Sequence, residues 1–160
     1  SQPPRSFGGR KTFVEVIMKI SMACDHGGLE LKNALKAHLL DKGYQVCDFG
    51  TYTTDSCDYP DYAKLAAQAV SSGECDFGVV VCTTGIGVSI VANKVKGVRC
   101  ALCQNVDMAT MTRKHNNANV IAFGQKYTSV ADAIAMTDAF LTTEFEGGRH
   151  QRRVDKIENL

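Results

Sequence analysis

The sequence predicts an α/β protein in which helices cover both faces of a parallel β-sheet, giving a three-layer α/β/α sandwich. Three observations carry this prediction. Five short apolar runs have the length and composition of buried strands. Segments with apolar residues at helical spacing alternate with them, and glycines stand at several of the junctions. Strands that alternate with helices in this way build a parallel sheet with helices on both sides.

The first half of the chain is expected to supply two strands and two helices. Residues 16–23 form an apolar run that predicts the first strand. Residues 29–40 carry apolar side chains near helical spacing, and Gly43 follows, as glycine commonly does at the end of a helix. Residues 44–49 predict a short second strand, and an alanine-rich helix over 62–70 follows a polar loop.

The second half continues the alternation. Residues 77–81 form an unbroken apolar run, which is typical of a central strand buried on both faces. The further elements expected are helices over 88–95, 106–114 and 128–141, strands over 98–103 and 119–123, and a basic helix that begins near Gly148. Five strands in this arrangement favour a doubly wound sheet of flavodoxin-like order 2-1-3-4-5, with the basic helix added at the C-terminus.

Length and composition fit one domain over residues 16–160. Residues 1–15 lack apolar periodicity and a hydrophobic signal core, which indicates a natural N-terminal extension or a cloning remnant. The net charge of +1 gives no general attraction to nucleic acid or to a membrane surface. No apolar run approaches the ~20 residues of a membrane helix, so we expect neither kind of partner.

The seven cysteines are odd in number and lack the spacing of a disulfide framework, which favours a reduced, cytoplasmic setting. Cys100 and Cys103 form a C-x-x-C pattern inside a predicted strand. Positions i and i+3 of a strand point to opposite faces, which argues against a redox pair. No close pair of histidines or cysteines has the spacing of a metal-binding helix or knuckle, so no metal is expected.

The segment from Cys82 to Gly87 is the strongest candidate site, because a thiol, two hydroxyls and two glycines stand between a predicted strand and a predicted helix. Glycines let backbone amides approach a ligand closely, and a helix N-terminus favours negative charge. Both features favour the thiolate of Cys82, although an ordinary buried core cysteine also fits the position. Ile90 stands where a dinucleotide-binding loop has its third glycine, and the chain has no Gly-Lys-Ser/Thr for a Walker loop.

The predicted strand order brings the loops after the first and third strands together at the carboxyl edge of the sheet. Asp25 and His26 follow the first strand and are therefore expected beside the thiol, although Asp25 also suits the cap of the next helix. His115 lies between a helix and the last strand, as a site residue or as part of a helix C-terminal cap. Arg149 and Arg153 share one helix face, which favours a phosphate clamp over a solvated basic tail.

These residues together resemble the ribose-5-phosphate isomerase B family, which also includes the bacterial galactose-6-phosphate isomerase subunits. The likeness covers nearly all of residues 18–158. The motifs that carry it are Asp25-His26, Asp58-Tyr59-Pro60-Asp61-Tyr62-Ala63, Cys82 to Gly87 with Ala92-Asn93-Lys94, Gly97-Val98-Arg99, His115-Asn116-Asn117-Ala118-Asn119, and Gly147-Gly148-Arg149-His150 with Arg153. Several motifs in one order are far more specific than any one of them alone.

The resemblance implies an aldose–ketose isomerase that interconverts ribose-5-phosphate and ribulose-5-phosphate through a cis-enediolate, without a metal or an organic cofactor. It implies that Cys82 is the base and that Thr84 serves the enediolate oxygens. It gives the opening of the furanose ring to His115, with Asp25 as its partner. The substrate-binding residues that it implies are His26, Thr83, Gly85, Ile86, Gly87, Asn116, Lys126, Arg149 and Arg153. It also implies an active site shared between subunits, in a homodimer or a dimer of dimers.

Three positions depart from the family pattern. Thr83 stands where the family usually has glycine, Lys126 where it usually has a phosphate-binding arginine, and Val88 where other members have glutamate. Thr83 leaves the choice of sugar open, with galactose-6-phosphate and allose-6-phosphate as alternatives. A non-catalytic flavodoxin-like module that binds a phosphate-bearing ligand is a further alternative, and it would have no need of Cys82 and His115 in one chain.

Overall fold

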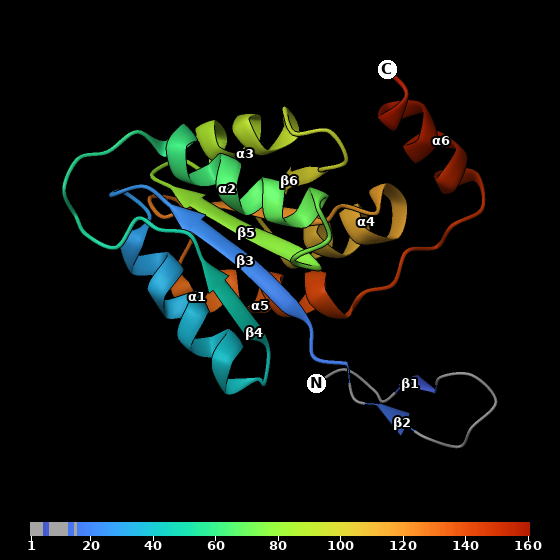
Figure 1. Ribbon diagram of the computed structural model, residues 1–160, viewed down its shortest axis with the longest axis horizontal. Coiled ribbons are helices and arrows are strands. Elements are labelled where there is room, and N and C mark those ends of the chain that lie inside the picture. The colour runs from blue at the N-terminus through green and yellow to red at the C-terminus, as the bar shows by residue number, and fades with distance from the viewer. Residues whose placement is uncertain (1–4, 7–12, 15) are drawn as a thin grey trace.

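The computed structural model describes residues 5–6, 13–14 and 16–160, and it contains a five-stranded parallel sheet (Figure 1). The strands of this sheet are β3 (Lys19–Cys24), β4 (Gln45–Asp48), β5 (Phe77–Cys82), β6 (Cys100–Leu102) and β7 (Val120–Gly124). The helices are α1 (Leu29–Asp41), α2 (Tyr59–Ser71), α3 (Ile86–Asn93), α4 (Val106–Asn116), α5 (Val130–Thr142) and α6 (Arg149–Glu158). Every pairing within the sheet is parallel, as the alternation of elements requires.

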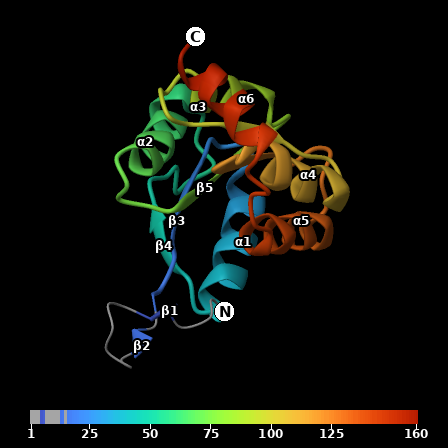
Figure 2. The ribbon, with the colours of Figure 1, turned by 90° about the vertical axis from the view of Figure 1, so that its right-hand side faces the viewer.

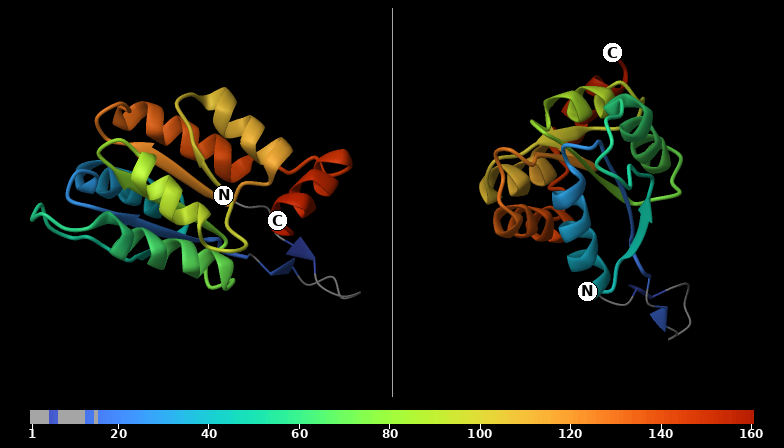
Figure 3. Two further views of the ribbon diagram at one scale, coloured as in Figure 1. Left: turned by 90° about the horizontal axis from the view of Figure 1, so that it is seen from above. Right: turned by 90° about the vertical axis from the view of Figure 1, so that its left-hand side faces the viewer.

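The helices form a layer on each face of the sheet, which confirms the three-layer sandwich. Helices α1, α4 and α5 lie on one face, and α2 and α3 lie on the other (Figure 2). The C-terminal helix α6 stands apart from both layers and packs against α4, so the expected extra helix is present (Figure 3). None of the helices in the described part of the chain is long and apolar enough to cross a membrane.

The order of the strands is β4-β3-β5-β7-β6, which in chain order is 2-1-3-5-4. The predicted order 2-1-3-4-5 was therefore wrong for its last two strands. The physical reason is burial: every residue of β7 is buried, whereas β6 has three residues and all are partly exposed. The long apolar strand takes the inner position beside β5, and the short strand becomes the edge.

Two apolar clusters, one on each face of the sheet, hold the layers together. Large side chains such as Leu35, Phe123 and Phe140 fill the face that α1 and α5 cover. The opposite face is built from small residues of α2, including Ala66 and Ala67. Small side chains allow α2 to lie close to the sheet, and this fixes the start of α2 beside the carboxyl ends of the strands.

The N-terminal segment contributes a separate two-stranded antiparallel sheet, in which β1 (Arg5–Ser6) pairs with β2 (Phe13–Val14). The prediction of an extension or cloning remnant over residues 1–15 falls largely on residues 1–4, 7–12 and 15, which lie outside the described part. The division at residue 15 therefore stays a prediction.

Candidate active site

Cys82 is the last residue of β5, and its sulfur is held by the turn that starts α3. The amide of Gly85 donates a hydrogen bond to the Cys82 Sγ over 3.1 Å. Gly85 adopts a φ of 78°, a conformation that glycine accepts without strain. A Cβ on Gly85 would also lie 2.7 Å from the backbone carbon of Phe123, so the turn has no room for a side chain. The donor and the helix N-terminus both stabilise negative charge on the sulfur.

The loop after β3 lies directly against the loop after β5. The Asp25 amide donates to the carbonyl oxygen of Val81 over 3.3 Å. A Cβ on Gly27 would overlap the Thr83 hydroxyl, so the two loops are in van der Waals contact. The expectation that these loops meet at the carboxyl edge is thus confirmed, and the central order of β3 and β5 is the reason.

The two loops enclose a pocket of about 400 Å³. Its lining residues are Asp25, Tyr59, Cys82, Thr83, Thr84, Ile86, Gly87 and Ile90. The structure thus brings Asp25, Cys82 and both threonines together. Cys82 is only 5% exposed, so its sulfur lies at the bottom of a pocket whose rim is formed by more exposed residues. A buried carboxylate and a buried thiol in one small pocket suit proton transfer to and from a bound molecule.

The structure adds two lining residues to the set considered from the sequence. Tyr59, in the first turn of α2, packs over the loop so closely that a Cβ on Gly87 would lie 2.6 Å from its ring. Tyr59 belongs to the motif around Pro60, and a proline in the first turn of a helix was the available signal that this residue begins α2. Ile90 lies one turn into α3 and supplies an apolar side wall.

Asp25 is buried at 6% exposure, and its Oδ1 accepts a hydrogen bond of 2.9 Å from the Gly27 amide. This bond closes a turn, so the alternative interpretation of Asp25 as the cap of the following helix was wrong. The N-cap of α1 is Gly28, and the first-turn amide of Leu31 is instead satisfied by the Gln125 side chain over 2.9 Å. The carboxylate of Asp25 keeps a second oxygen for the pocket.

His26 is exposed beside the pocket, and its Nδ1 accepts a hydrogen bond of 3.3 Å from the Cys57 amide. This contact ties His26 to the polar loop after β4. Because Nδ1 is an acceptor here, the proton of a neutral ring lies on Nε2. His26 can thus offer a donor to an anion at the mouth of the pocket.

The loop after β7 supports the site from its other side. The amide of Gln125 donates to the Cys82 carbonyl over 2.9 Å, and the amide of Lys126 donates to the Thr83 carbonyl over 3.0 Å. A Cβ on Gly124 would collide with the backbone of Thr84. The backbone of Lys126 is therefore fixed next to the loop, while its exposed side chain reaches over the Tyr127 ring at 5.7 Å.

Four predicted site residues lie near the amino ends of the strands, whereas the pocket lies at their carboxyl ends. They are His115, Asn116, Arg149 and Arg153. Helix α4 runs back from the carboxyl edge, and the carbonyl of Asn119 accepts from the Gly78 amide at the beginning of β5. Cys82 ends the same strand four residues later, which at ~3.3 Å per residue separates the two edges by ~13 Å. Figure 1 shows α6 at the tail end of the strand arrows, away from the loops after β3 and β5. One chain therefore does not bring all of its predicted site residues together.

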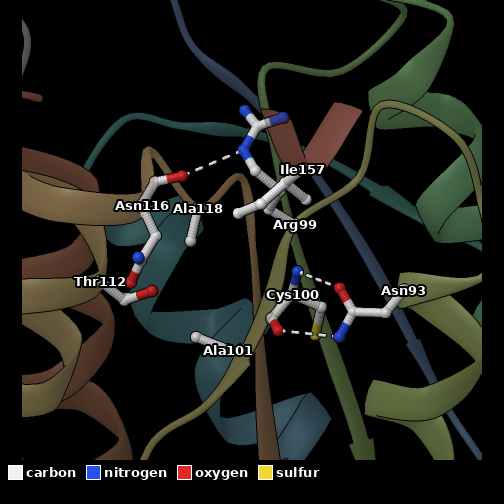
Figure 4. A pocket seen from close by; sticks show the side chains of 8 residues that line it. All are labelled: Asn93, Arg99, Cys100, Ala101, Thr112, Asn116, Ala118 and Ile157. Atoms are coloured by element: carbon white, nitrogen blue, oxygen red, sulfur yellow. Dashed lines mark hydrogen bonds between the residues drawn. The ribbon is translucent and has the colours of Figure 1, made fainter. Parts of the chain in front are cut away.

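A second hollow, of about 310 Å³, lies between the edge strand β6 and helices α3, α4 and α6 (Figure 4). The Asn93 side chain bonds both the amide of Cys100, over 2.8 Å, and its carbonyl, over 3.0 Å. The Asn93 side chain thereby takes up backbone hydrogen-bonding groups of β6 that face away from the sheet, on its exposed edge. On the other side of the hollow, the Arg99 Nε donates to the Asn116 carbonyl and its Nη1 to Glu158, which fastens α6 to α4.

Both cysteines of the C-x-x-C pattern, Cys100 and Cys103, are free thiols in the structure. All seven cysteines are free. Burial raises the pKa of Cys103 to about 11 and raises that of Cys100 further. A raised pKa favours the protonated thiol, which reacts more slowly than the thiolate.

At the α4–α6 junction, His115 has two partners that the sequence interpretation did not single out. Its ring stacks on that of His150, with centroids 4.2 Å apart and planes at 12°. The Glu146 Oε1 lies 3.4 Å from the His115 Nε2 and 3.7 Å from the His150 Nε2. A metal ion cannot lie in the planes of two parallel stacked rings at once, so this arrangement does not form a metal site without rotation of a ring. The spacing of Glu146 and His150, four residues apart around two glycines, was the available signal.

Comparison with known proteins shows what this fold and pocket resemble. A family model described as Ribose/Galactose Isomerase matches residues 20–157. Ribose-5-phosphate isomerase B of Escherichia coli (strain K12) is 45% identical over 139 residues, which are 87% of this chain and 93% of that protein. The solved structure of ribose-5-phosphate isomerase B from Clostridium thermocellum matches with a TM-score of 0.88 and 49% identity, covering 89% of this chain and 96% of that one. The Mycoplasma genitalium enzyme, solved with bound ribulose-5-phosphate, matches with a TM-score of 0.85 and 43% identity, covering 89% and 95%.

Proposed function

Because this chain belongs to the ribose/galactose isomerase family, we propose that it is an aldose–ketose isomerase that interconverts ribose-5-phosphate and ribulose-5-phosphate. The observation that carries the proposal is the hydrogen bond from Gly85 to the Cys82 sulfur, in a pocket that also holds the Asp25 carboxylate. The bound ribulose-5-phosphate of the Mycoplasma genitalium relative supports the same substrate pair.

Cys82 is the base of the proposed reaction. Its thiolate takes the proton from C2 of the open-chain aldose, which leaves a cis-enediolate, and then returns a proton to C1 to give the ketose. Position 88 of this chain is a buried valine, so no carboxylate there competes for the role. A general base of this kind typically contributes about 10²- to 10⁴-fold to the rate.

The enediolate carries negative charge on its oxygens, and the start of α3 is suited to stabilise that charge. The first amides of a helix have no intrahelical partner and point outward from its N-terminus. In this turn the Gly85 amide serves the sulfur and the Ile86 amide bonds the Thr84 hydroxyl over 3.3 Å. The remaining amides of Thr83 to Gly87 are oxyanion donors, each worth ~3 kcal/mol when well aligned. In this proposal the Thr84 hydroxyl positions or reprotonates the enediolate oxygens.

A furanose must open before C2 can lose its proton, and we assign that step to His115 as the acid with Asp25 as the base. The two edges of one chain are too far apart for this pair to act within a single subunit. We therefore infer a homodimer in which the edge of one copy that bears His115 covers the pocket of the other. A two-fold axis would complete two such sites at once.

The same arrangement brings phosphate-binding groups together. His26 and Lys126 stand beside the pocket of one copy, and Arg149 and Arg153 are exposed on the edge that the second copy presents. Guanidinium groups bind phosphate oxygens through paired hydrogen bonds, which suits them to the end of the sugar that does not react. The free cysteines fit a reduced, cytoplasmic compartment for this enzyme.

The direct test is to incubate the purified protein with ribose-5-phosphate and measure the ribulose-5-phosphate formed. Galactose-6-phosphate and allose-6-phosphate are assayed beside it, with Cys82→Ser as the control for contaminating isomerase. Rapid conversion of the five-carbon substrate alone is expected. Faster conversion of a six-carbon substrate would reassign the sugar, and no conversion of any of the three would refute an isomerase.

A further inference from the structure

Two histidines and one glutamate meet where α4 ends and α6 begins. The His115 side chain is 37% exposed, whereas the side chain of His150 beneath it is only 10% exposed. The Glu146 carboxylate faces Nε2 of both rings, at 3.4 Å and 3.7 Å. Among the residues that the structure describes, it is the one carboxylate within 4 Å of His115.

Backbone contacts position Glu146 and His150 beside His115. The amide of Glu146 donates to the carbonyl of Lys114 over 3.1 Å, which ties Glu146 to the residue just before His115. Gly147 and Gly148 follow with φ values of 69° and 57°, so the chain turns sharply into α6. That turn brings residue 150 back under the ring of residue 115. The backbone path from residue 146 to residue 150 therefore sets the contacts of Glu146 and His150 with His115.

The charges around the two rings differ. Burial lowers the pKa of His150, and positive charge on His115 and on Arg149 lowers it further. Arg153 acts in the same direction, while Glu146 opposes it. A lowered pKa favours the neutral His150 ring, and a neutral ring stacks on His115 without the repulsion that two stacked imidazolium rings would have.

We propose that Glu146 and His150 are positioning residues for His115: the carboxylate holds the Nε2 side of its ring and its proton, and the stacked ring fixes its plane. The other ring nitrogen of His115 is then free to serve the sugar. This inference rests on the proposed function, which makes His115 the acid of ring opening. Lys114 precedes His115 in the chain and Arg149 and Arg153 lie on α6, so within the described residues Glu146 is the one carboxylate among these basic groups that contacts the His115 ring.

The experiment compares Glu146→Gln with Glu144→Gln, a matched loss of one carboxylate two residues away on the same segment. His150→Phe, which keeps a stacking ring, is compared with His150→Ala, which removes it. Each variant is assayed with ribose-5-phosphate, which must be opened, and in single turnover with ribulose-5-phosphate, which is already open-chain. In parallel, modification of His115 by diethyl pyrocarbonate, which acylates an unprotonated imidazole nitrogen, is followed by peptide mapping.

We expect Glu146→Gln to lower kcat for ribose-5-phosphate by about tenfold with little change in KM, because the phosphate-binding groups remain. The loss with ribulose-5-phosphate should be smaller, and the basic side of the kcat profile should move to lower pH. Diethyl pyrocarbonate should react faster with His115 in this variant. His150→Phe should retain most of the activity that His150→Ala loses.

Two results would overturn the inference. One is a Glu146→Gln variant that matches Glu144→Gln in kcat, in pH profile and in the rate of His115 modification. The other is equal loss of activity in His150→Phe and His150→Ala. Failure of the proposed function is recognised separately. In that case the parent protein does not convert ribose-5-phosphate, or His115→Ala converts it as fast as the parent does. The rates of His115 modification would still report the contact between Glu146 and His115.

Discussion

The amide nitrogen of Gly85 lies 3.1 Å from the sulfur of Cys82 and donates a hydrogen bond to it. This bond joins the last residue of a central strand to the first turn of a helix. Such a turn requires a residue with positive φ and no Cβ at position 85, and glycine meets both conditions. The Gly85 amide thus binds the sulfur and the next amide, that of Ile86, binds the Thr84 hydroxyl, so one turn at the start of α3 holds both side chains.

Replacement Cys82→Ser should abolish isomerisation, with a loss of at least about a hundredfold in kcat, because a serine hydroxyl without a neighbouring base is a far weaker proton acceptor. Folding should be little changed, since the hydroxyl can accept the same hydrogen bond from Gly85. The measurement is steady-state conversion of ribose-5-phosphate together with thermal unfolding. Cys47→Ser, a partly buried cysteine on β4, is the matched control and should remain active; near-normal turnover of Cys82→Ser would remove this thiol from the mechanism.

Replacement Gly85→Ala should lower both stability and activity. The positive φ alone costs about 1–2 kcal/mol for a residue with a Cβ. The added Cβ would also press on the backbone of Phe123 and Gly124, which cannot move without disturbing β7. Gly43→Ala is the control, because Gly43 has a φ of 91° but nothing within 4 Å of its Cβ position. Equal unfolding temperatures for the two variants would show that the close approach at Gly85 carries no cost.

The sequence was sufficient for the fold class and for the carboxyl-edge pocket, for a clear reason. Apolar runs and their alternation with helical segments are local signals, and the meeting of the loops that hold Asp25 and Cys82 follows from the order of the central strands. The exchange of the last two strands was missed because strand order depends on burial. Residues 98–103 and 119–123 look similar as isolated strands, and only packing reveals that the latter is buried on both sides.

The candidate site was predictable in part. The motifs predict His115 and Arg149 as well as Cys82 as site residues, but a motif carries no information on which end of the strands its helix reaches. The direction of α4 sends His115 to the far edge, and this becomes visible only in three dimensions. The contact of Glu146 with His115 depends on the chain turn at two glycines, which pattern reading does not resolve.

Replacement Lys32→Met should destabilise the protein by about 3 kcal/mol at neutral pH, because it removes the buried one of the two lysines that pair with the largely buried Asp48 carboxylate. The Lys32 Nζ is fully buried, 2.7 Å from Asp48 and 2.6 Å from the Thr51 carbonyl. Lys36→Met is the control, because Lys36 is 37% exposed at 3.2 Å from the same carboxylate and should contribute much less. Urea unfolding of the two variants measures the difference, and similar losses in both would contradict this prediction.

The same pair gives the stability a defined pH dependence. Burial raises the pKa of Asp48, but hydrogen bonds from Lys32 and the Gly50 amide outweigh that effect, and the net pKa lies below its usual value. A carboxyl whose folded pKa is depressed contributes stability that is fully present above its unfolded pKa of about 3.9. That contribution is lost as the pH falls through the lower, folded value. The parent should therefore lose stability in acid more steeply than Asp48→Asn, measured by unfolding from neutral pH down to pH ~3.

Replacement of Arg149 or Arg153 by alanine should raise KM for ribose-5-phosphate and spare the fold, because exposed arginines contribute little stability. A charged hydrogen bond is worth about 1.5–3 kcal/mol, so each loss should weaken binding by about ten- to a hundredfold. Inorganic phosphate should compete with substrate in the parent and much less in the double variant. Arg152→Ala, one residue away on an exposed part of α6, is the control. A double variant with parental KM and parental phosphate inhibition would mean that the substrate phosphate binds elsewhere.

Mixing two inactive variants should restore activity if the site is shared between subunits. Cys82→Ser lacks the proposed base in the pocket, and His115→Ala lacks the proposed acid at the opposite end of the sheet. In a dimer that contains one chain of each kind, one of its two sites receives both defects and the other receives neither. Random exchange of equal amounts makes half of the dimers mixed, so about a quarter of the parental activity should return.

Recovery of activity requires that the two variants exchange subunits, so a mixture without exchange is the control. The two variants are mixed after separate unfolding and refolding, and in parallel they are refolded together. Recovery should appear after joint refolding and should rise towards the expected quarter as exchange becomes complete. If each site were built within one chain, every chain would carry a defect and no mixture would recover activity. Failure of recovery in a mixture proven by mass spectrometry to contain mixed dimers would thus reject the shared site.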